Sequence, residues 1–307
     1  MKNKNKYINA YVGTALVGGL LVSGGIMASS YRFFRKMMDV NYDRDDLYTI
    51  NNVPYDYSWI KDYQNEDVYI NSFDNLKLHG LKIYAKQKTS NWVILVHGYK
   101  SLNMMMIDRA LEFIKKGFNV LLIDQRCCGY SAGRYITYGW LEHYDLLDWI
   151  NYIVDIDSES KIVLYGFSMG ASTILNATGE YLVDNIKCVV SDSGFTSMKD
   201  QIKFVNKKKN KLNNSVLLSS LKLIVKNKCG FDINDASCLK QLQQSVTPTL
   251  FIHGEEDLNV PYEMVFENYY ACNATKELLT IANANHFQTT DNPHYYDRIF
   301  TFINRFI

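Results

Sequence analysis

The sequence predicts an α/β fold, with a mostly parallel sheet of about eight strands and helices on both faces. Two observations carry this prediction. Short apolar runs typical of strands alternate with helical patterns from about residue 92 to the C-terminus, and a Gly-x-Ser-x-Gly sequence lies between one such run and a helical stretch. Alternation of this kind favours a parallel sheet covered on both sides. At 307 residues the chain is long enough for one large domain.

An uncharged stretch from Tyr7 to Tyr31 lies near the start of the chain, with lysines before it and basic residues after it. It is long enough to cross a bilayer as a helix. We therefore predict a transmembrane anchor with its basic flanks over residues 1–36 and a juxtamembrane linker over residues 37–64. Cleavage near Ala28 to Ser30 is the alternative, although a signal peptide usually has a shorter apolar core. Basic residues flank both ends of this stretch, so charge alone does not select one orientation. We expect a short N-terminal tail inside and the main domain to be extracytoplasmic.

The predicted domain spans residues 65–307. It opens with a hairpin, because residues 67–72 and 76–85 alternate in polarity around Asp74-Asn75. Six further strands are expected near residues 92–97, 119–124, 161–166, 186–191, 248–253 and 277–282. Residues 195–246 interrupt this rhythm after the sixth strand and are rich in Lys, Asn, Leu and Ser.

The Gly-x-Ser-x-Gly sequence occupies residues 166–170 and centres on Ser168. It follows the apolar run 162–165 and precedes the small-residue helical run 171–175. Strand, sharp turn and helix in this order are typical of a nucleophile elbow, in which the strained serine projects its hydroxyl at the N-terminus of a helix. The alternative is an ordinary strand-to-helix turn with a capping serine.

A carboxylate and a histidine follow in the order that such a site requires, serine, then acid, then histidine. Asp257 lies on the loop after the strand at 248–253, and His286 lies just after the last strand. Asp192, after the strand at 186–191, is the alternative acid. We prefer Asp257 because it belongs to the more specific sequence His-Gly-x-x-Asp-x-x-Val-Pro.

These residues resemble those of the α/β-hydrolase superfamily, in the branch of bacterial esterases, lipases and serine-aminopeptidase-like hydrolases. The resemblance extends from about residue 65 to the C-terminus. It also includes His97-Gly98 and the stretch from Asp124 to Gly133. The resemblance implies the α/β-hydrolase fold, and it agrees with the position of Ser168, Asp257 and His286, each at the carboxyl end of its own strand.

The resemblance further implies a helical cap inserted after the sixth strand, over residues 195–246. Within it, Ser215 to Val225 is expected to form a helix that lines the substrate entrance. The chain departs from the family at one loop beside the site. Many relatives carry Asp-x-Arg-Gly there, whereas Cys127 and Cys128 replace the glycine and its neighbour in this chain.

The residue types define a mechanism. A serine hydroxyl is a weak nucleophile at neutral pH and needs an adjacent base. His286 is expected to accept the proton of Ser168, while Asp257 holds the imidazole tautomer and stabilises the imidazolium. The backbone N–H groups of Tyr99 and Met169 are expected to form the oxyanion hole. The sequence thus predicts a serine hydrolase that cleaves carboxylic esters, or amides, through an acyl-enzyme.

Composition limits the partners. The formal net charge of +1 gives no indication of nucleic-acid binding, and the six cysteines show neither a Cys-x-x-Cys pair nor a Cys/His metal spacing. We expect no cofactor and no metal, a small-molecule or lipid-like ester as substrate, and membrane contact through the N-terminal helix. A bridge between Cys229 and Cys238 is left open. The alternatives are an aminopeptidase-like peptidase and a non-catalytic ligand-binding protein on the same fold.

Overall fold

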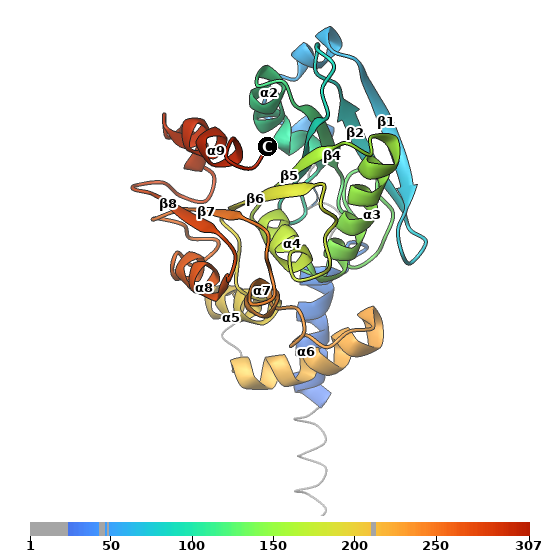
Figure 1. Ribbon diagram of the computed structural model, residues 1–307. Coiled ribbons are helices and arrows are strands. Elements are labelled where there is room, and N and C mark those ends of the chain that lie inside the picture. The colour runs from blue at the N-terminus through green and yellow to red at the C-terminus, as the bar shows by residue number, and fades with distance from the viewer. Residues whose placement is uncertain (1–23, 43–46, 48, 210–212) are drawn as a thin grey trace, which may run out of the picture.

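A computed structural model of the protein describes residues 24–42, 47, 49–209 and 213–307 (Figure 1). Its centre is an eight-stranded sheet of order β1-β2-β4-β3-β5-β6-β7-β8. The strands are β1 (Asn65–Asn71), β2 (Lys77–Ile83), β3 (Asn91–Val96), β4 (Asn119–Ile123), β5 (Lys161–Phe167), β6 (Ile186–Asp192), β7 (Thr249–Gly254) and β8 (Lys276–Ile281). The β1–β2 and β2–β4 pairs are antiparallel, and the other neighbouring strands are parallel. The predicted sheet is therefore confirmed.

Helices cover both faces of this sheet. They are α2 (Ile107–Lys115), α3 (Trp140–Ile156), α4 (Met169–Ala177), α5 (Met198–Lys209), α6 (Asn214–Cys229), α7 (Cys238–Leu242), α8 (Glu263–Ala271) and α9 (Tyr295–Ile303). Short 3₁₀ helices lie at Ile50–Asn52, Ser58–Asp62, Asn103–Met106 and Thr289–Asp291. Helices α2 and α9 pack on one face of the sheet, and α3, α4, α7 and α8 pack on the other.

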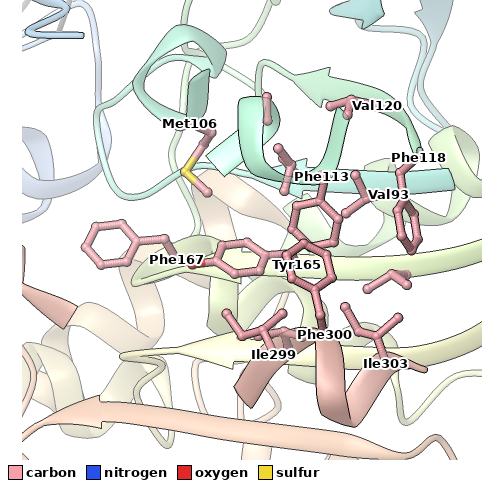
Figure 2. Packing of buried hydrophobic residues seen from close by; sticks show 14 of the residues in the cluster. Val93, Met106, Phe113, Phe118, Val120, Tyr165, Phe167, Ile299, Phe300 and Ile303 are labelled. Carbon is pink, nitrogen blue, oxygen red and sulfur yellow. The ribbon is translucent and has the colours of Figure 1, made fainter. Parts of the chain in front are cut away.

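The strands read as continuous apolar runs because the central sheet is buried on both faces. In β3, for example, Val93 contributes to the core beneath α2 and α9, while its neighbour Trp92 faces the opposite core. Figure 2 shows the first of these cores, where Phe113 of α2, Tyr165 of β5 and Phe300 of α9 come together. The rings of Phe113 and Phe300 meet edge to face with centroids 5.1 Å apart, an arrangement that aromatic pairs favour.

Two helices, α5 and α6, occupy the place of the expected insertion after β6. Helix α6 begins where the side chain of Asn213 accepts hydrogen bonds from two backbone N–H groups, and it ends at Gly230, whose φ of 83° is left-handed. Helix α7 also falls inside the predicted cap range 195–246. Its buried Cys238 and Leu242, however, pack with the α3 and α4 side of the sheet. The cap therefore ends before α7.

The end of the N-terminal helix packs against the domain. Residues 24–38 are helical, and Phe33, Phe34, Met37 and Met38 are buried in one hydrophobic cluster with residues of α6. In Figure 1 this blue helix passes beside α6. The predicted boundary between residues 36 and 37 is therefore wrong as a structural division, because apolar side chains on both sides of it are buried in the same core.

Most of the predicted transmembrane span, Tyr7 to Tyr31, lies outside the described residues. Over the described ranges, the structure contains no helix that is both long enough and apolar enough to cross a membrane.

Candidate active site

Ser168 lies in the tight turn between β5 and α4. Its φ of 56° and ψ of −119° are strained for a residue with a side chain. The glycines on either side of it are required by close backbone contacts. A Cβ on Gly166 would lie 2.3 Å from the carbonyl oxygen of Gly170, and a Cβ on Gly170 would lie 2.1 Å from that of Val96. The strand and helix can approach this closely only without these side chains, so the turn has the geometry expected of a nucleophile elbow.

The structure brings the three residues Ser168, His286 and Asp257 together from separate loops. The Nε2 atom of His286 lies 2.9 Å from the Oγ of Ser168, and its Nδ1 lies 2.6 Å from Oδ2 of Asp257. Because a carboxylate only accepts hydrogen bonds, Nδ1 carries the proton and Nε2 is the acceptor for the serine hydroxyl. His286 and Asp257 are both buried. This tautomer can take a proton from Ser168.

The carboxylate of Asp257 is fully hydrogen-bonded. Its Oδ1 accepts from the backbone N–H groups of Asn259 and Val260, at 2.7 and 2.9 Å. Its Oδ2 accepts from His286 and also lies 3.1 Å from Nε2 of His253. Burial alone would raise the pKa of Asp257, but the hydrogen bonds from His253 and His286 hold that pKa well below its usual range.

His253 is a contact of the site that the sequence did not reveal. In the sequence, His253 is the first residue of the His-Gly-x-x-Asp motif at the end of the strand at 248–253. In the structure its Nε2 faces both the Asp257 carboxylate and the carbonyl oxygen of Val260, which lies 3.2 Å away. The spacing His-x-x-x-Asp could have indicated this contact, because a tight loop after β7 brings Asp257 back to the side chain of His253 at the end of the strand.

The low pKa of Asp257 predicts a contribution to acid stability. An unfolded aspartate titrates near ~3.9. Because the folded-state pKa lies below that value, the contribution is fully present above the unfolded pKa and is lost as the pH falls through the folded one. We expect the free energy of unfolding, measured by urea denaturation, to fall less steeply below pH ~4 in Asp257→Asn than in the wild type. Equal slopes in both proteins would contradict this assignment.

The alternative acid, Asp192, does not contact a histidine. Its Oδ2 accepts hydrogen bonds from the hydroxyl groups of Tyr165, Tyr295 and Thr289, at 3.2, 2.6 and 2.9 Å. The residue is completely buried at the end of β6. The structure therefore gives Asp192 a place in a buried hydrogen-bond network between the sheet and the last helix, separate from His286.

The two predicted oxyanion donors, Tyr99 and Met169, belong to the two segments that adjoin Ser168. Met169 is the first residue of α4, where backbone N–H groups have no partner within the helix. Gly98 and Tyr99 follow β3, and a Cβ on Gly98 would lie 3.4 Å from the Cβ of Ser168. The loop that carries Tyr99 thus passes directly against the serine.

A cavity of about 310 Å³ opens beside Ser168 and His286. Its lining is largely apolar and includes Met37, Tyr99, Met106, Tyr138, Phe167 and Phe195. The cap contributes Gln201, Phe204, Val205 and Lys208, all from α5. The prediction that Ser215 to Val225 lines the entrance is wrong, because this part of α6 packs its buried side chains on the N-terminal helix cluster instead.

The described part of the chain holds no group of three or more His, Cys, Asp or Glu residues arranged to bind a metal ion. All six cysteines are free, so Cys229 and Cys238 are not bridged.

Comparison with known proteins supports the assignment of the fold. The family described as alpha/beta hydrolase fold matches residues 91–222. The uncharacterized protein YqkD of Bacillus subtilis is 26% identical over 214 residues, which cover 69% of this chain and 70% of that protein. The chain has the α/β-hydrolase fold, and these matches support its place in the α/β-hydrolase superfamily.

Solved structures agree. The Pyrococcus furiosus esterase Pf2001 superposes with a TM-score of 0.65 at 27% identity, over 82% of this chain and 97% of that one. Acetyl xylan esterase 1 from Thermoanaerobacterium gives a TM-score of 0.61 at 15% identity, over 82% of this chain and 85% of that one. At 15% identity, the likeness to acetyl xylan esterase 1 is evidence for the fold alone. The Pf2001 esterase, at 27% identity, supports a hydrolase.

Proposed function

We propose that this protein is a serine hydrolase that cleaves carboxylic esters through an acyl-enzyme. The observation that carries the proposal is the chain of hydrogen bonds from Asp257 through His286 to Ser168, set on a strained elbow beside an apolar cavity. Nucleophile, base and orienting acid within hydrogen-bond reach are the signature of covalent catalysis by serine.

In the proposed reaction Ser168 Oγ attacks the ester carbonyl while His286 Nε2 takes its proton. The N–H groups of Tyr99 and Met169 stabilise the oxyanion of the tetrahedral intermediate. The imidazolium then protonates the departing alcohol, which leaves an acyl-enzyme. Water, activated by the same histidine, hydrolyses that ester and releases the acid.

The cavity favours an apolar acyl or alkyl group over a charged one. Among the described residues that line it, none is Asp or Glu, whereas Arg109 and Lys208 are cationic. An aminopeptidase needs an acidic group to bind the substrate amine. The lining therefore supports a small-molecule or lipid-like ester and weighs against the peptidase alternative.

We further propose that the N-terminal segment anchors the enzyme in a membrane, with the domain outside the cytoplasm. The support is the uncharged sequence from Tyr7 to Tyr31 between basic flanks. The full-length protein is expected to remain in the membrane pellet after carbonate extraction. Release into the supernatant would contradict the anchor without affecting the proposed chemistry.

A fluorophosphonate probe tests the hydrolase function, because only an activated serine reacts rapidly with it. We expect labelling of Ser168, located by mass spectrometry, together with turnover of p-nitrophenyl esters. A folded protein that is neither labelled at Ser168 nor active on a panel of short and medium esters would instead be the non-catalytic ligand-binding alternative.

A further inference from the structure

We infer that the last turn of the N-terminal helix is part of the catalytic site, where it clamps the loop that carries the oxyanion donor and forms one wall of the cavity. The inference rests on the proposed function and adds a role for residues 33–40. It differs from the anchor proposal, because a tether alone makes no demand on the structure of the site.

Two side chains of the loop after β3 donate hydrogen bonds to the end of the helix. The hydroxyl of Tyr99 lies 2.7 Å from the carbonyl oxygen of Met37, and Nζ of Lys100 lies 3.4 Å from that of Lys36. The final carbonyls of a helix have no partner within it and carry the negative end of its dipole. A hydroxyl and an ammonium group are suitable donors for both.

The loop needs external support because its backbone is strained. Lys100 has a φ of 54°, which is uncommon for a residue with a long side chain, and its side chain is buried. Strained conformations persist only where surrounding contacts hold them. The bonds from Tyr99 and Lys100 to the helix supply such contacts, and they come from the residue that carries the predicted oxyanion N–H and from the residue after it.

The helix end is itself fixed to the domain at several points. Asp39 forms an isolated β-bridge with Tyr135, and its carboxylate lies 3.0 Å from Arg134. Backbone bonds join Val40 to Arg134 and Ile136 to Met38, at 3.0 and 2.9 Å. A segment with these backbone partners is an integral part of the domain. It can therefore hold the loop after β3 in a fixed position through the bonds from Tyr99 and Lys100.

The same turn also shapes the cavity. Met37 is buried, and both Met37 and Tyr99 line the cavity. The hydrophobic cluster that holds the helix end includes Met169, the residue that supplies the second predicted oxyanion donor. The helix therefore touches the cavity wall and packs in the same cluster as the start of α4.

The clamp is tested in the full-length protein by Tyr99→Phe and Lys100→Met, with Lys100→Arg as the conservative control. Each loss of a donor is expected to lower kcat for p-nitrophenyl esters by roughly 10-fold with little change in KM, since misplacing an oxyanion donor weakens only transition-state binding. Affinity for an alkyl boronic acid, which mimics the tetrahedral intermediate, should fall in parallel. Lys100→Arg should keep wild-type kcat and boronate affinity.

The wall is tested by Met37→Ala, with Met27→Ala as the matched control, because Met27 lies on the same helix but is 40% exposed. Met37→Ala should shift kcat/KM several-fold toward longer acyl chains relative to butyrate, and Met27→Ala should not. Wild-type kcat in both clamp variants, or an unchanged chain-length preference in Met37→Ala, overturns the inference. Absence of both turnover and Ser168 labelling in the wild type would instead overturn the proposed function.

Discussion

Ser168→Ala is expected to lower kcat for ester hydrolysis by roughly 10⁴ to 10⁶ and to leave the fold intact. The substitution removes only Oγ, the atom that lies 2.9 Å from Nε2 of His286. Alanine keeps the Cβ that the strained turn already accommodates. The measurement is kcat on a p-nitrophenyl ester, with circular dichroism and thermal melting to establish that the variant is folded.

The adjacent strand offers a matched control in Ser193→Ala. Ser193 also has a left-handed φ, 59°, follows the end of a central strand, and is buried. Its hydroxyl, however, donates to Asp192 and not to a histidine. We expect kcat of Ser193→Ala to stay within a few-fold of wild type. Near-normal turnover by folded Ser168→Ala would exclude the acyl-enzyme mechanism.

The sheet was predictable because its central strands are buried on both faces, and such strands consist of nearly continuous apolar residues. The proximity of Ser168, Asp257 and His286 was predictable for a related reason. These residues follow β5, β7 and β8, and the carboxyl ends of neighbouring parallel strands lie along one edge of the sheet.

The cap was less predictable, since periodicity shows that a helix has an apolar face but not what that face contacts. The apolar residues of α6 pack on the N-terminal helix, whereas α5 supplies the cavity lining. The hydrogen bonds from Tyr99 to Met37 and from Lys100 to Lys36 could not be predicted from the sequence for another reason. Their acceptors are backbone carbonyls, which every residue has.

The departure at Cys127 has a structural counterpart. This residue stands where many relatives carry glycine, and its φ is 69°. The loop thus keeps the left-handed conformation that favours glycine, even though a side chain is present. Its sulfur is buried beside Gly133, where an added Cβ would lie 2.7 Å from it. Cys127 therefore places a buried thiol against Gly133 from a position whose backbone is left-handed.

Asp257→Asn is expected to lower kcat on the order of 10⁴, the second largest effect. The geometry fixes how an asparagine would sit. Two backbone N–H groups, from Asn259 and Val260, require an oxygen at the Oδ1 position. The amide NH₂ would then replace Oδ2 and face His286 Nδ1. That group would donate to Nδ1 and favour the tautomer with its proton on Nε2, which cannot accept the proton of Ser168.

Asp192→Asn discriminates between the two acids. Its carboxylate holds Tyr165, Tyr295 and Thr289 in the core and has no contact with His286. We expect it to destabilise the fold by about 1–3 kcal/mol, because the amide NH₂ must replace one of two oxygens that both accept hydrogen bonds from buried hydroxyl groups. The kcat of the folded protein is expected to stay within a few-fold of wild type. The comparison is made on kcat for folded protein and on the free energy of unfolding. A large loss of kcat in Asp192→Asn together with near-normal kcat in Asp257→Asn would transfer the role of the acid to the end of β6.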